Sequence, residues 1–382
     1  MFLRPNSSYF FGEFKSSLNF FNTEEIMMKK LLALVLSAGM ILSLTACGGS
    51  SSTAATTAAP AATEAETEAP AETEAPAASG EVITLRASHS CAETHPYHLG
   101  LQKFAELVDQ KTNGAVKIDI FGSAQLGDER ANIEDLQMGT LDIAVSSTGP
   151  LGNFVEDFLI LDLPFLFSNY DHAHAVLDGE IGQGLIAKLD DIGIVGGAFW
   201  ENGFREMTNS KHPIESAADA AGLKLRCMEN QVHMDAFAAL GMDPTPMAWS
   251  EVFTALQQGV IDGQENPIAV IYSNKVYEAQ KYLAITNHVY SPSLILFSKS
   301  VFEGLDPAYQ TALLEAAKEA ADYERSCCED NESAQIEEMK GLGLEVTYPD
   351  VTEFQAAMAP VYEKYAAQFG QENIDAIVNY AY

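Results

Sequence analysis

The sequence predicts an α/β fold of two lobes that flank a cleft. Strand-like and amphipathic helical segments alternate at short spacing from residue 81 to 146, and the alternation restarts near residue 193. The pattern Gly-x-x-Asp before a strand occurs at 139–142 and again at 259–262, which favours two similar half-units. Apolar residues make up 47% of the chain, enough for a large core.

The N-terminal segment is predicted to be a signal peptide. Lys29 and Lys30 precede an uncharged run at 31–46, which is shorter than the roughly 20 residues of a bilayer span but fits a signal core. The run ends Leu-Thr-Ala-Cys at 44–47 and resembles a bacterial lipoprotein signal, which implies that Cys47 becomes the lipidated N-terminus. An ordinary secretory signal with an incidental cysteine is the alternative. Residues 1–26 are interpreted as an over-extended start.

Residues 48–80 are predicted to be a disordered linker. They consist almost wholly of Ala, Thr, Glu, Ser, Pro and Gly, and cannot bury enough apolar surface to offset chain entropy. Proline and like-charged glutamates keep such a segment extended. It is either a spacer between the membrane and a globular part or a filler of no required length.

Acidic residues dominate the chain. There are 54 Asp and Glu against 21 Lys and Arg, a formal net charge of -33 at pH 7. This balance argues against nucleic acid and against polybasic contact with anionic lipid, because both need clustered Lys and Arg. Residues 81–382 alone hold 46 acidic and 17 basic residues, so the charge belongs to the fold. An anionic ligand would therefore need a locally positive pocket.

The first half-unit lies between residues 81 and 146. Strands are predicted at 81–88, 115–121 and 141–146 from β-rich or alternating patterns. Helices are predicted at 96–112, ended by Asn113-Gly114, and at 128–138, ended by Gly139. This order implies an α/β unit with a mostly parallel sheet.

The second half-unit and the C-terminal segments follow from residue 193. Asp306 as cap and Pro307 at the first position begin a long helix predicted to reach about Lys340, roughly 50 Å, long enough to bridge two lobes. Ser250 is predicted to cap the helix that ends at 258. The strands are predicted at 193–200, 223–226, 260–263, 290–297 and 344–348, and the other helices at 230–240, 351–370 and 372–380.

Ligands of open α/β sheets bind beyond the carboxyl ends of the strands. The candidate ligand residues therefore lie in five windows, 88–91, 146–148, 200–205, 226–229 and 264–267.

Two arginines fall in these windows. Arg226 ends an apolar strand, and its planar guanidinium can hold a carboxylate through two parallel hydrogen bonds. A structural ion pair is the equally weighted alternative, with so many acids nearby. Arg205 could also bind a ligand, or it could simply be exposed to solvent.

Asn266 and Trp249 are weaker candidates. Asn266 lies in a dense polar cluster closed by Pro267, where an amide can donate to one ligand oxygen and accept from a hydroxyl. Its alternative is a turn residue before proline. Trp249 could form a pocket wall, or pack in the core or at a rim.

Catalytic and metal motifs are weak. The sequence holds no Gly-x-Ser-x-Gly, His-Glu-x-x-His or Walker loop. His89, His95 and His98 cluster, but Pro96 interrupts the spacing that a metal site needs, so neither a metal nor a cofactor is expected. The cysteines other than Cys47 are interpreted as buried or free thiols in preference to a disulfide framework: Cys91, Cys227, Cys327 and Cys328.

Several runs in residues 81–382 together resemble the TRAP transporter solute-binding proteins, the extracytoplasmic subunits of tripartite ATP-independent transporters. The runs are HP (95–96), FGSAQLGDER (121–130), GTLD (139–142), LPFLF (163–167), NGFR (202–205), NSKHPI (209–214), GLKLR (222–226) and GVIDGQENP (259–267).

The resemblance implies a periplasmic-binding-protein-like (venus-flytrap) fold, in which two α/β domains close over the ligand and a long helix spans both. We expect one domain at 81–204 and 291–331 and the other at 205–290 and 332–382. By the same resemblance, Arg226 forms a salt bridge with the ligand carboxylate, and Asn266 and Trp249 line the pocket. The remaining ligand contacts are expected from Arg205, Glu129, Ser147, Ser90 and His89.

The expected function is non-enzymatic capture of a small organic acid, such as a dicarboxylate or a uronate. The resemblance implies delivery to the small and large membrane subunits of a TRAP permease, from a lipid anchor on the outer face of the cell membrane. A binding protein of an ATP-driven (ABC) importer is the first alternative. A surface-tethered enzyme, such as a hydrolase, is the second.

Overall fold

The computed structural model of the chain describes residues 82–382. In this part of the chain, ten strands form one sheet in the order β2-β1-β3-β9-β4-β7-β5-β6, and β8 joins β10 to β4. The strands are β1 (Ile83–Ser88), β2 (Val116–Phe121), β3 (Ile143–Ser147), β4 (Ile194–Asn209), β5 (Lys224–Cys227), β6 (Asp243–Pro246), β7 (Gly263–Pro267), β8 (Tyr282–Ala284), β9 (Tyr290–Ser298) and β10 (Glu345–Thr347).

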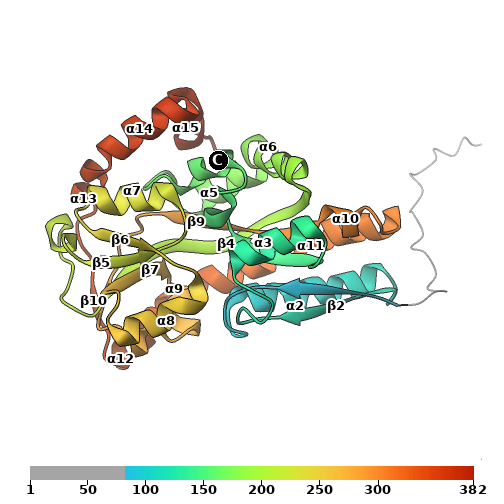
Figure 1. Cartoon of the computed structure of the whole chain (residues 1–382), viewed down its shortest axis with the longest axis horizontal. Helices are drawn as coiled ribbons and strands as arrows, with labels where there is room; N and C mark the ends of the chain where they lie inside the picture. The colour runs from blue at the N-terminus through green and yellow to red at the C-terminus, as the bar shows by residue number, and fades with distance from the viewer. Residues whose placement is uncertain (1–81) are drawn as a thin grey trace, which may run out of the picture. The chain divides into compact units, whose positions relative to one another are not determined.

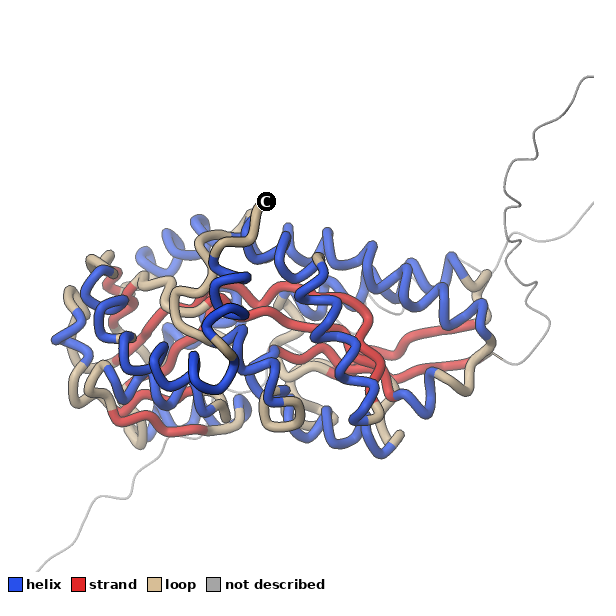
Figure 2. The backbone as a smooth tube through the Cα atoms, turned by 90° about the horizontal axis from the view of Figure 1, so that it is seen from above, coloured by secondary structure: helices blue, strands red, loops and turns tan. Residues whose placement is uncertain are grey.

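Helices cover both faces of this sheet (Figure 2). The α-helices are α2 (Pro96–Lys111), α3 (Glu129–Met138), α4 (Thr148–Leu151), α5 (Tyr170–Asp178), α6 (Glu180–Ala187), α7 (Gln231–Ala239), α8 (Trp249–Gln258), α9 (Ile268–Ser273), α10 (Lys299–Phe302), α11 (Pro307–Glu329), α12 (Glu332–Gly341), α13 (Thr352–Ala357), α14 (Ala359–Phe369) and α15 (Gln371–Val378). The 3-10 helices are η1 (Glu156–Asp162), η2 (Lys188–Ile192), η3 (Ala217–Ala220) and η4 (Val276–Glu278).

The sheet is parallel in its outer parts and antiparallel at its centre. β1 pairs parallel with β2 and β3, as expected for the first half-unit, and β5 pairs parallel with β6 and β7. The central strands β9 and β4 run antiparallel to their neighbours. The sheet is therefore mixed, because two long strands join the parallel parts.

Strand β4 connects the two halves. It pairs with β9 up to Phe204, and with β7 from Arg205 onwards. We call the part built on β2-β1-β3-β9 lobe I and the part built on β7-β5-β6 lobe II (Figure 1). The sequence-based division at 204/205 stays a prediction, and β4 is continuous through it.

The predicted long helix is two helices. α11 extends over 23 residues, about 34 Å, and ends at Glu329, so the prediction that it reaches Lys340 is wrong. Asp330 and Asn331 interrupt it, and the Asn331 side chain donates to the Cys327 carbonyl; such short polar side chains compete with helical hydrogen bonds. α11 packs on α2 of lobe I, whereas α12 packs on α9 of lobe II.

The predicted start of α11 is confirmed. Asp306 is its N-cap and accepts from the backbone N–H of Ala308, with Pro307 at the first helical position. The predicted cap of α8 is wrong, because Ala248 occupies the N-cap and Ser250 lies in the first turn. Ser250 instead bonds across to lobe I, as described below.

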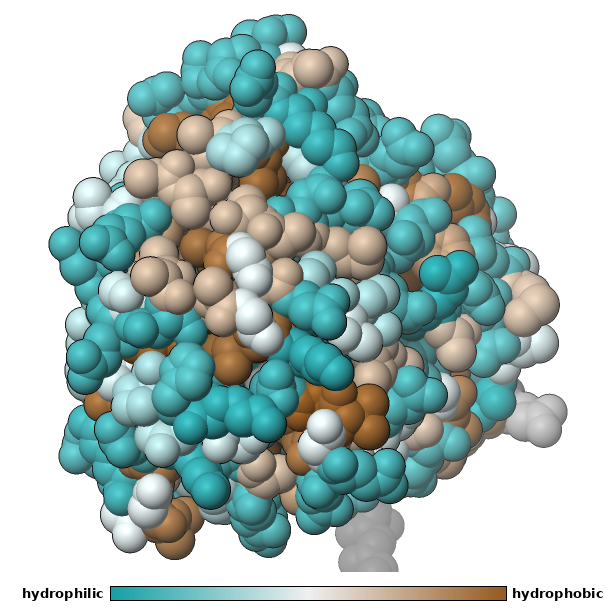
Figure 3. Space-filling model, turned by 60° about the vertical axis from the view of Figure 1, so that its left-hand side comes forward, coloured by the Kyte–Doolittle hydropathy of each residue, from teal (hydrophilic) through white to brown (hydrophobic). Residues whose placement is uncertain are grey.

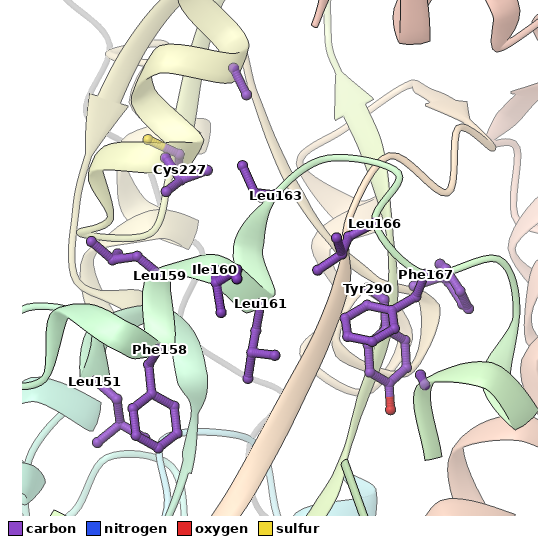
Figure 4. Packing of buried hydrophobic residues seen from close by; sticks show 14 of the residues in the cluster. Leu151, Phe158, Leu159, Ile160, Leu161, Leu163, Leu166, Phe167, Cys227 and Tyr290 are labelled. Carbon is purple, nitrogen blue, oxygen red and sulfur yellow. The ribbon is translucent and has the colours of Figure 1, made fainter. Parts of the chain in front are cut away.

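Three apolar clusters form the core. The largest joins both lobes, because side chains of η1 pack between Leu151 of lobe I and Cys227 of lobe II (Figure 4). The second lies between the lobe I sheet, α2 and α11, and the third lies beneath α8, α9 and α12. The four cysteines of the described residues are free thiols, and all but Cys327 are buried.

Hydrophilic residues cover most of the face in Figure 3, with a band of less polar residues across it. Within residues 82–382, no helix is both long and apolar enough to cross a membrane. The predicted signal, Cys47 and the predicted linker lie outside the described residues.

Candidate functional site

A small cavity lies between the two lobes. Its wall combines residues of both lobes: Ser90, Cys91, Tyr97, Glu129, Ser147, Asn202, Arg226, Met228, Trp249, Asn266 and Val270. Six of the eight ligand residues expected from the sequence are among them. The cavity is also where the strand argument placed it, because Ser90, Ser147, Arg226 and Asn266 lie at or just beyond the carboxyl ends of β1, β3, β5 and β7.

Arg226 brings a positive charge to this wall. The arginine is 4% exposed, and its Nε and Nη2 donate to the Met247 carbonyl at 2.9 and 2.6 Å. Its guanidinium carbon lies 5.5 Å from the Trp249 ring centroid, within the range of a cation–π contact. Among residues 82–382 no carboxylate is within ion-pair distance of it, so the structural ion pair considered from the sequence is not present there.

Burial lowers the pKa of Arg226, because the charged form loses its solvation. Glu265 opposes this shift, whereas the neighbouring Arg205 adds to it. Arginine keeps its proton in proteins, so the guanidinium is a buried, incompletely compensated cation. Such a group favours an anion beside it.

Glu129 supplies the opposite charge at the same wall. Its Oε1 accepts from the Ser147 backbone N–H and its Oε2 from the Ser147 hydroxyl, both at 2.7 Å. Burial raises the pKa of Glu129, and the two Ser147 bonds and the charges of Arg226 and Arg205 oppose the rise. Each carboxylate oxygen keeps a further lone pair with which to accept from a ligand hydroxyl.

Asn266 and Trp249 complete the lobe II wall. Asn266 lies on β7 and donates through Nδ2 to Gln264 Oε1 at 2.6 Å, which fixes the amide orientation. Trp249 is the first residue of α8 and packs partly against both the second and the third cluster. The turn position considered for Asn266 is wrong, because the residue lies in a strand. Trp249 both packs against the core and lines the cavity.

Arg205 and His89 do not line the cavity. Arg205 is fully buried, which excludes simple exposure, and its Nε and Nη2 hold the Glu265 carboxylate through two hydrogen bonds. Its Nη1 is buried without a hydrogen-bond partner among the described residues. His89 is also fully buried, and its Nε2 is 3.0 Å from His98 Nδ1. Burial lowers the pKa of His89 to about 3.

Direct contacts between the lobes surround the cavity. The Ser250 backbone N–H and hydroxyl donate to the Asp128 carboxylate at 3.0 and 2.5 Å. On another side, Asn230 Nδ2 donates to the Gly149 carbonyl at 2.9 Å. A Cβ at Gly149 would lie 2.6 Å from Met228 Cε, so a larger residue would require the Met228 side chain to move. The lobes are thus closed over the site.

Comparison with known proteins identifies the family. The sequence profile described as "Bacterial extracellular solute-binding protein, family 7" matches residues 87–368. The chain belongs to this family. A "Solute-binding protein" of Verminephrobacter eiseniae is 43% identical over 295 residues, 77% of this chain and 88% of the relative.

Solved structures of TRAP periplasmic solute-binding proteins have the same fold as this family 7 protein. One from Polaromonas sp. JS666, bound to D-erythronate, is 45% identical with a TM-score of 0.77 and covers 78% of this chain and 100% of its own. One from Bordetella bronchispeptica, with density assigned to pantoate, is 42% identical with the same TM-score and the same coverage. The TRAP class and the two-domain binding-protein fold expected from the sequence are confirmed, and the ABC-importer alternative gains no support.

Five residues that line the family 7 cavity were not predicted as ligand residues: Cys91, Tyr97, Asn202, Met228 and Val270. Cys91, Asn202 and Met228 fall in the windows just after strands, so position alone could have found them. Tyr97 and Val270 reach the cavity from α2 and α9, and no local pattern indicates this.

Proposed function

We propose that this family 7 protein captures a small hydroxylated monocarboxylate and delivers it to the small and large membrane subunits of a TRAP permease. The observation that carries the proposal is Arg226, a buried guanidinium that faces the cavity without an ion-pair partner among residues 82–382. A ligand carboxylate at this position would form charge-assisted hydrogen bonds with the guanidinium and so replace the solvation that the arginine loses on burial.

The ligand class follows from Glu129. Glu129 favours hydroxyl donors at the far end of the ligand and repels a second carboxylate. The ligands named for the two solved relatives, D-erythronate and pantoate, are both hydroxylated monocarboxylates. This supports a sugar acid or a similar hydroxy acid over a C4-dicarboxylate.

We infer a binding role without turnover. A closed pair of lobes presents a surface that the permease can distinguish from the open form, and ion gradients supply the energy for transport. No nucleophile–base pair was identified from the sequence, and the cavity wall contains no histidine. Recovery of the bound acid unchanged after prolonged incubation supports this role, whereas a product would revive the hydrolase alternative.

We also propose that the protein is anchored by a lipid on Cys47, on the outer face of the cell membrane. The support is the sequence: two lysines, an uncharged run and Leu-Thr-Ala-Cys, followed by a linker of extended composition. The mass of the N-terminal peptide of the mature protein tests this. A diacylated peptide starting at Cys47 is expected, and an unmodified N-terminus at another residue would contradict it.

The function is tested by calorimetry of the wild type, Arg226→Ala and Lys224→Ala, using the best acid from a thermal-shift panel of erythronate, pantoate, galactonate, glucuronate and succinate. Removing one partner of a buried charge pair costs about 2–5 kcal/mol, so Arg226→Ala should weaken binding by roughly 30-fold or more. Lys224→Ala removes the same charge from an exposed position two residues earlier on β5 and should change affinity less than twofold.

Two results would contradict the proposal. If no acid of the panel stabilises the wild type, the ligand class is wrong. If Arg226→Ala and Lys224→Ala bind the best acid equally well, the carboxylate does not bind at Arg226. Circular dichroism of each variant shows that a loss of binding is not a loss of fold.

A further inference from the structure

A second cluster of ligating side chains lies outside the cavity, where α5, β4 and the end of α11 meet. It consists of His174, Glu201 and Glu329, whose ligand atoms all lie within 4.8 Å of one another. His174 Nε2 is 2.8 Å from Glu201 Oε2 and 3.9 Å from Glu329 Oε1. None of the three lines the cavity, so this cluster plays no part in the proposed capture of the acid.

The neighbours of Glu201 among residues 82–382 satisfy only one of its two carboxylate oxygens. Glu201 is fully buried on β4, and its Oε2 accepts from the Tyr290 hydroxyl at 2.9 Å. Its other oxygen, Oε1, is buried and has no hydrogen-bond partner among residues 82–382. An unsatisfied oxygen of a buried carboxylate is costly, because the charge has left water without full compensation. A cation bound at the carboxylate would remove this cost.

The surroundings are strongly acidic. Glu324 on α11 is fully buried, and its Oε2 accepts from the Glu201 backbone N–H at 2.8 Å. Glu332, at the start of α12, accepts from the Tyr170 hydroxyl at 3.3 Å. The nearby Arg325 offsets this negative charge only in part, because its guanidinium also holds Asp178 at 2.7 and 2.9 Å and the Phe199 carbonyl. Negative charge therefore exceeds positive charge around the three ligand atoms.

The cluster is open on one side. The side chain of Glu201 is fully buried, but those of His174 and Glu329 are 19% and 36% exposed. A hydrated ion can therefore reach the cluster and keep a water ligand. The donor set is one imidazole nitrogen with carboxylate oxygens, which suits Zn²⁺ and similar transition metals, whereas Ca²⁺ takes oxygen ligands alone.

We propose that His174, Glu201 and Glu329 bind a divalent transition-metal cation, with Zn²⁺ as the probe of choice. The three donors come from an α-helix, a strand and the end of another α-helix, so the ion ties together segments far apart in the sequence. Glu201 lies three residues before β4 leaves β9, and Glu329 is the last residue before the α11–α12 interruption. The ion would thus fasten the two chain segments that pass from lobe I to lobe II. The histidine spacing near residue 95 gave no hint of this site.

The test is calorimetric titration of ZnCl₂ into the metal-free protein, free of any affinity tag, for the wild type, His174→Gln and Glu329→Gln. One Zn²⁺ per chain is expected for the wild type, with affinity reduced at least tenfold in either variant. Glu353→Gln changes an exposed glutamate on α13 and should leave Zn²⁺ affinity unchanged. CaCl₂ should bind more weakly than ZnCl₂.

Arg226→Ala separates this proposal from the proposed function, since it should weaken acid binding by roughly 30-fold or more and leave Zn²⁺ binding intact. Circular dichroism verifies that each variant is folded. The proposal is overturned if the wild type binds no Zn²⁺, or if folded His174→Gln and Glu329→Gln both bind it as tightly as the wild type does. The latter result would place the ion elsewhere, for example at a thiol.

Discussion

Glu129→Gln should shift the ligand preference of this protein from hydroxylated monocarboxylates toward dicarboxylates. The substitution keeps the shape of the side chain and removes its charge. The Ser147 backbone N–H can still bond to the amide oxygen, and the amide nitrogen can donate to the Ser147 hydroxyl oxygen. The α3 helix, of which Glu129 is the first residue, retains its Gly139 C-cap, so the fold should persist.

Two effects set the size of the change in preference: a loss of affinity for hydroxy acids and a gain of affinity for dicarboxylates. A hydrogen bond from a ligand hydroxyl to a charged group contributes about 1.5–3 kcal/mol and one to a neutral group about 0.5–1.5 kcal/mol, so a hydroxy acid should lose roughly tenfold in affinity. A second ligand carboxylate about 5–6 Å from Glu129 would be repelled by about 3 kcal/mol at an effective dielectric of 20, and Gln removes much of that. The ratio of erythronate to succinate affinity should therefore fall by about 100-fold.

The assay is calorimetry of both acids with the wild type, Glu129→Gln and the exposed control Glu353→Gln. The control should match the wild type for both ligands. An unchanged erythronate-to-succinate ratio in folded Glu129→Gln would refute the reasoning, since it would mean that the far end of the ligand does not meet this carboxylate.

Two further predictions concern closure and pH. Asp128→Ala removes both hydrogen bonds that Ser250 makes across the lobes, and it removes no helix-capping bond. Acid affinity should therefore fall about tenfold, chiefly because the acid dissociates faster, which stopped-flow experiments measure. An unchanged dissociation rate would contradict this prediction. Burial lowers the pKa of His95 to about 3, below its unfolded value, so its stabilising contribution is present above pH 6.5 and is lost as the pH falls. Between pH 7 and 5, the free energy of unfolding in urea should change by about 2 kcal/mol less for His95→Asn than for the wild type, and the introduced asparagine side chain can still accept from the Tyr97 N–H. An equal change for both proteins would exclude the assignment.

Sequence patterns were sufficient to predict most of the elements and much of the cavity wall. The Asp306-Pro307 start of α11 and the glycine that ends α3 follow from local sequence. Whether a residue can cap a helix or adopt a left-handed conformation depends mainly on its own side chain. Arg226 and Asn266 could be located because they end buried strands, and parallel strands bring their carboxyl ends to one edge. This reasoning needs only periodicity and a fold rule.

The pairing of charges, in contrast, depends on the tertiary structure. From the sequence, Arg205 could have been solvent-exposed. It is instead fully buried and bonds to Glu265, 60 residues away, because β4 lies beside β7. Arg226 also has acids near it in the sequence, but it pairs with none of them among residues 82–382. The difference between a structural arginine and a ligand-binding one is thus set by which strands become neighbours.

The same holds for His174, Glu201 and Glu329, which no motif connects and which only the packing of α5, β4 and α11 brings within 4.8 Å. The interruption of α11 at Asp330 was closer to being predictable from the sequence. Two short polar residues, Asp330 and Asn331, mark the position, but the helical pattern continues beyond them. Local patterns report the chemistry of neighbours along the chain. Burial and charge pairing depend on neighbours in space, which here come from strands and helices tens of residues apart.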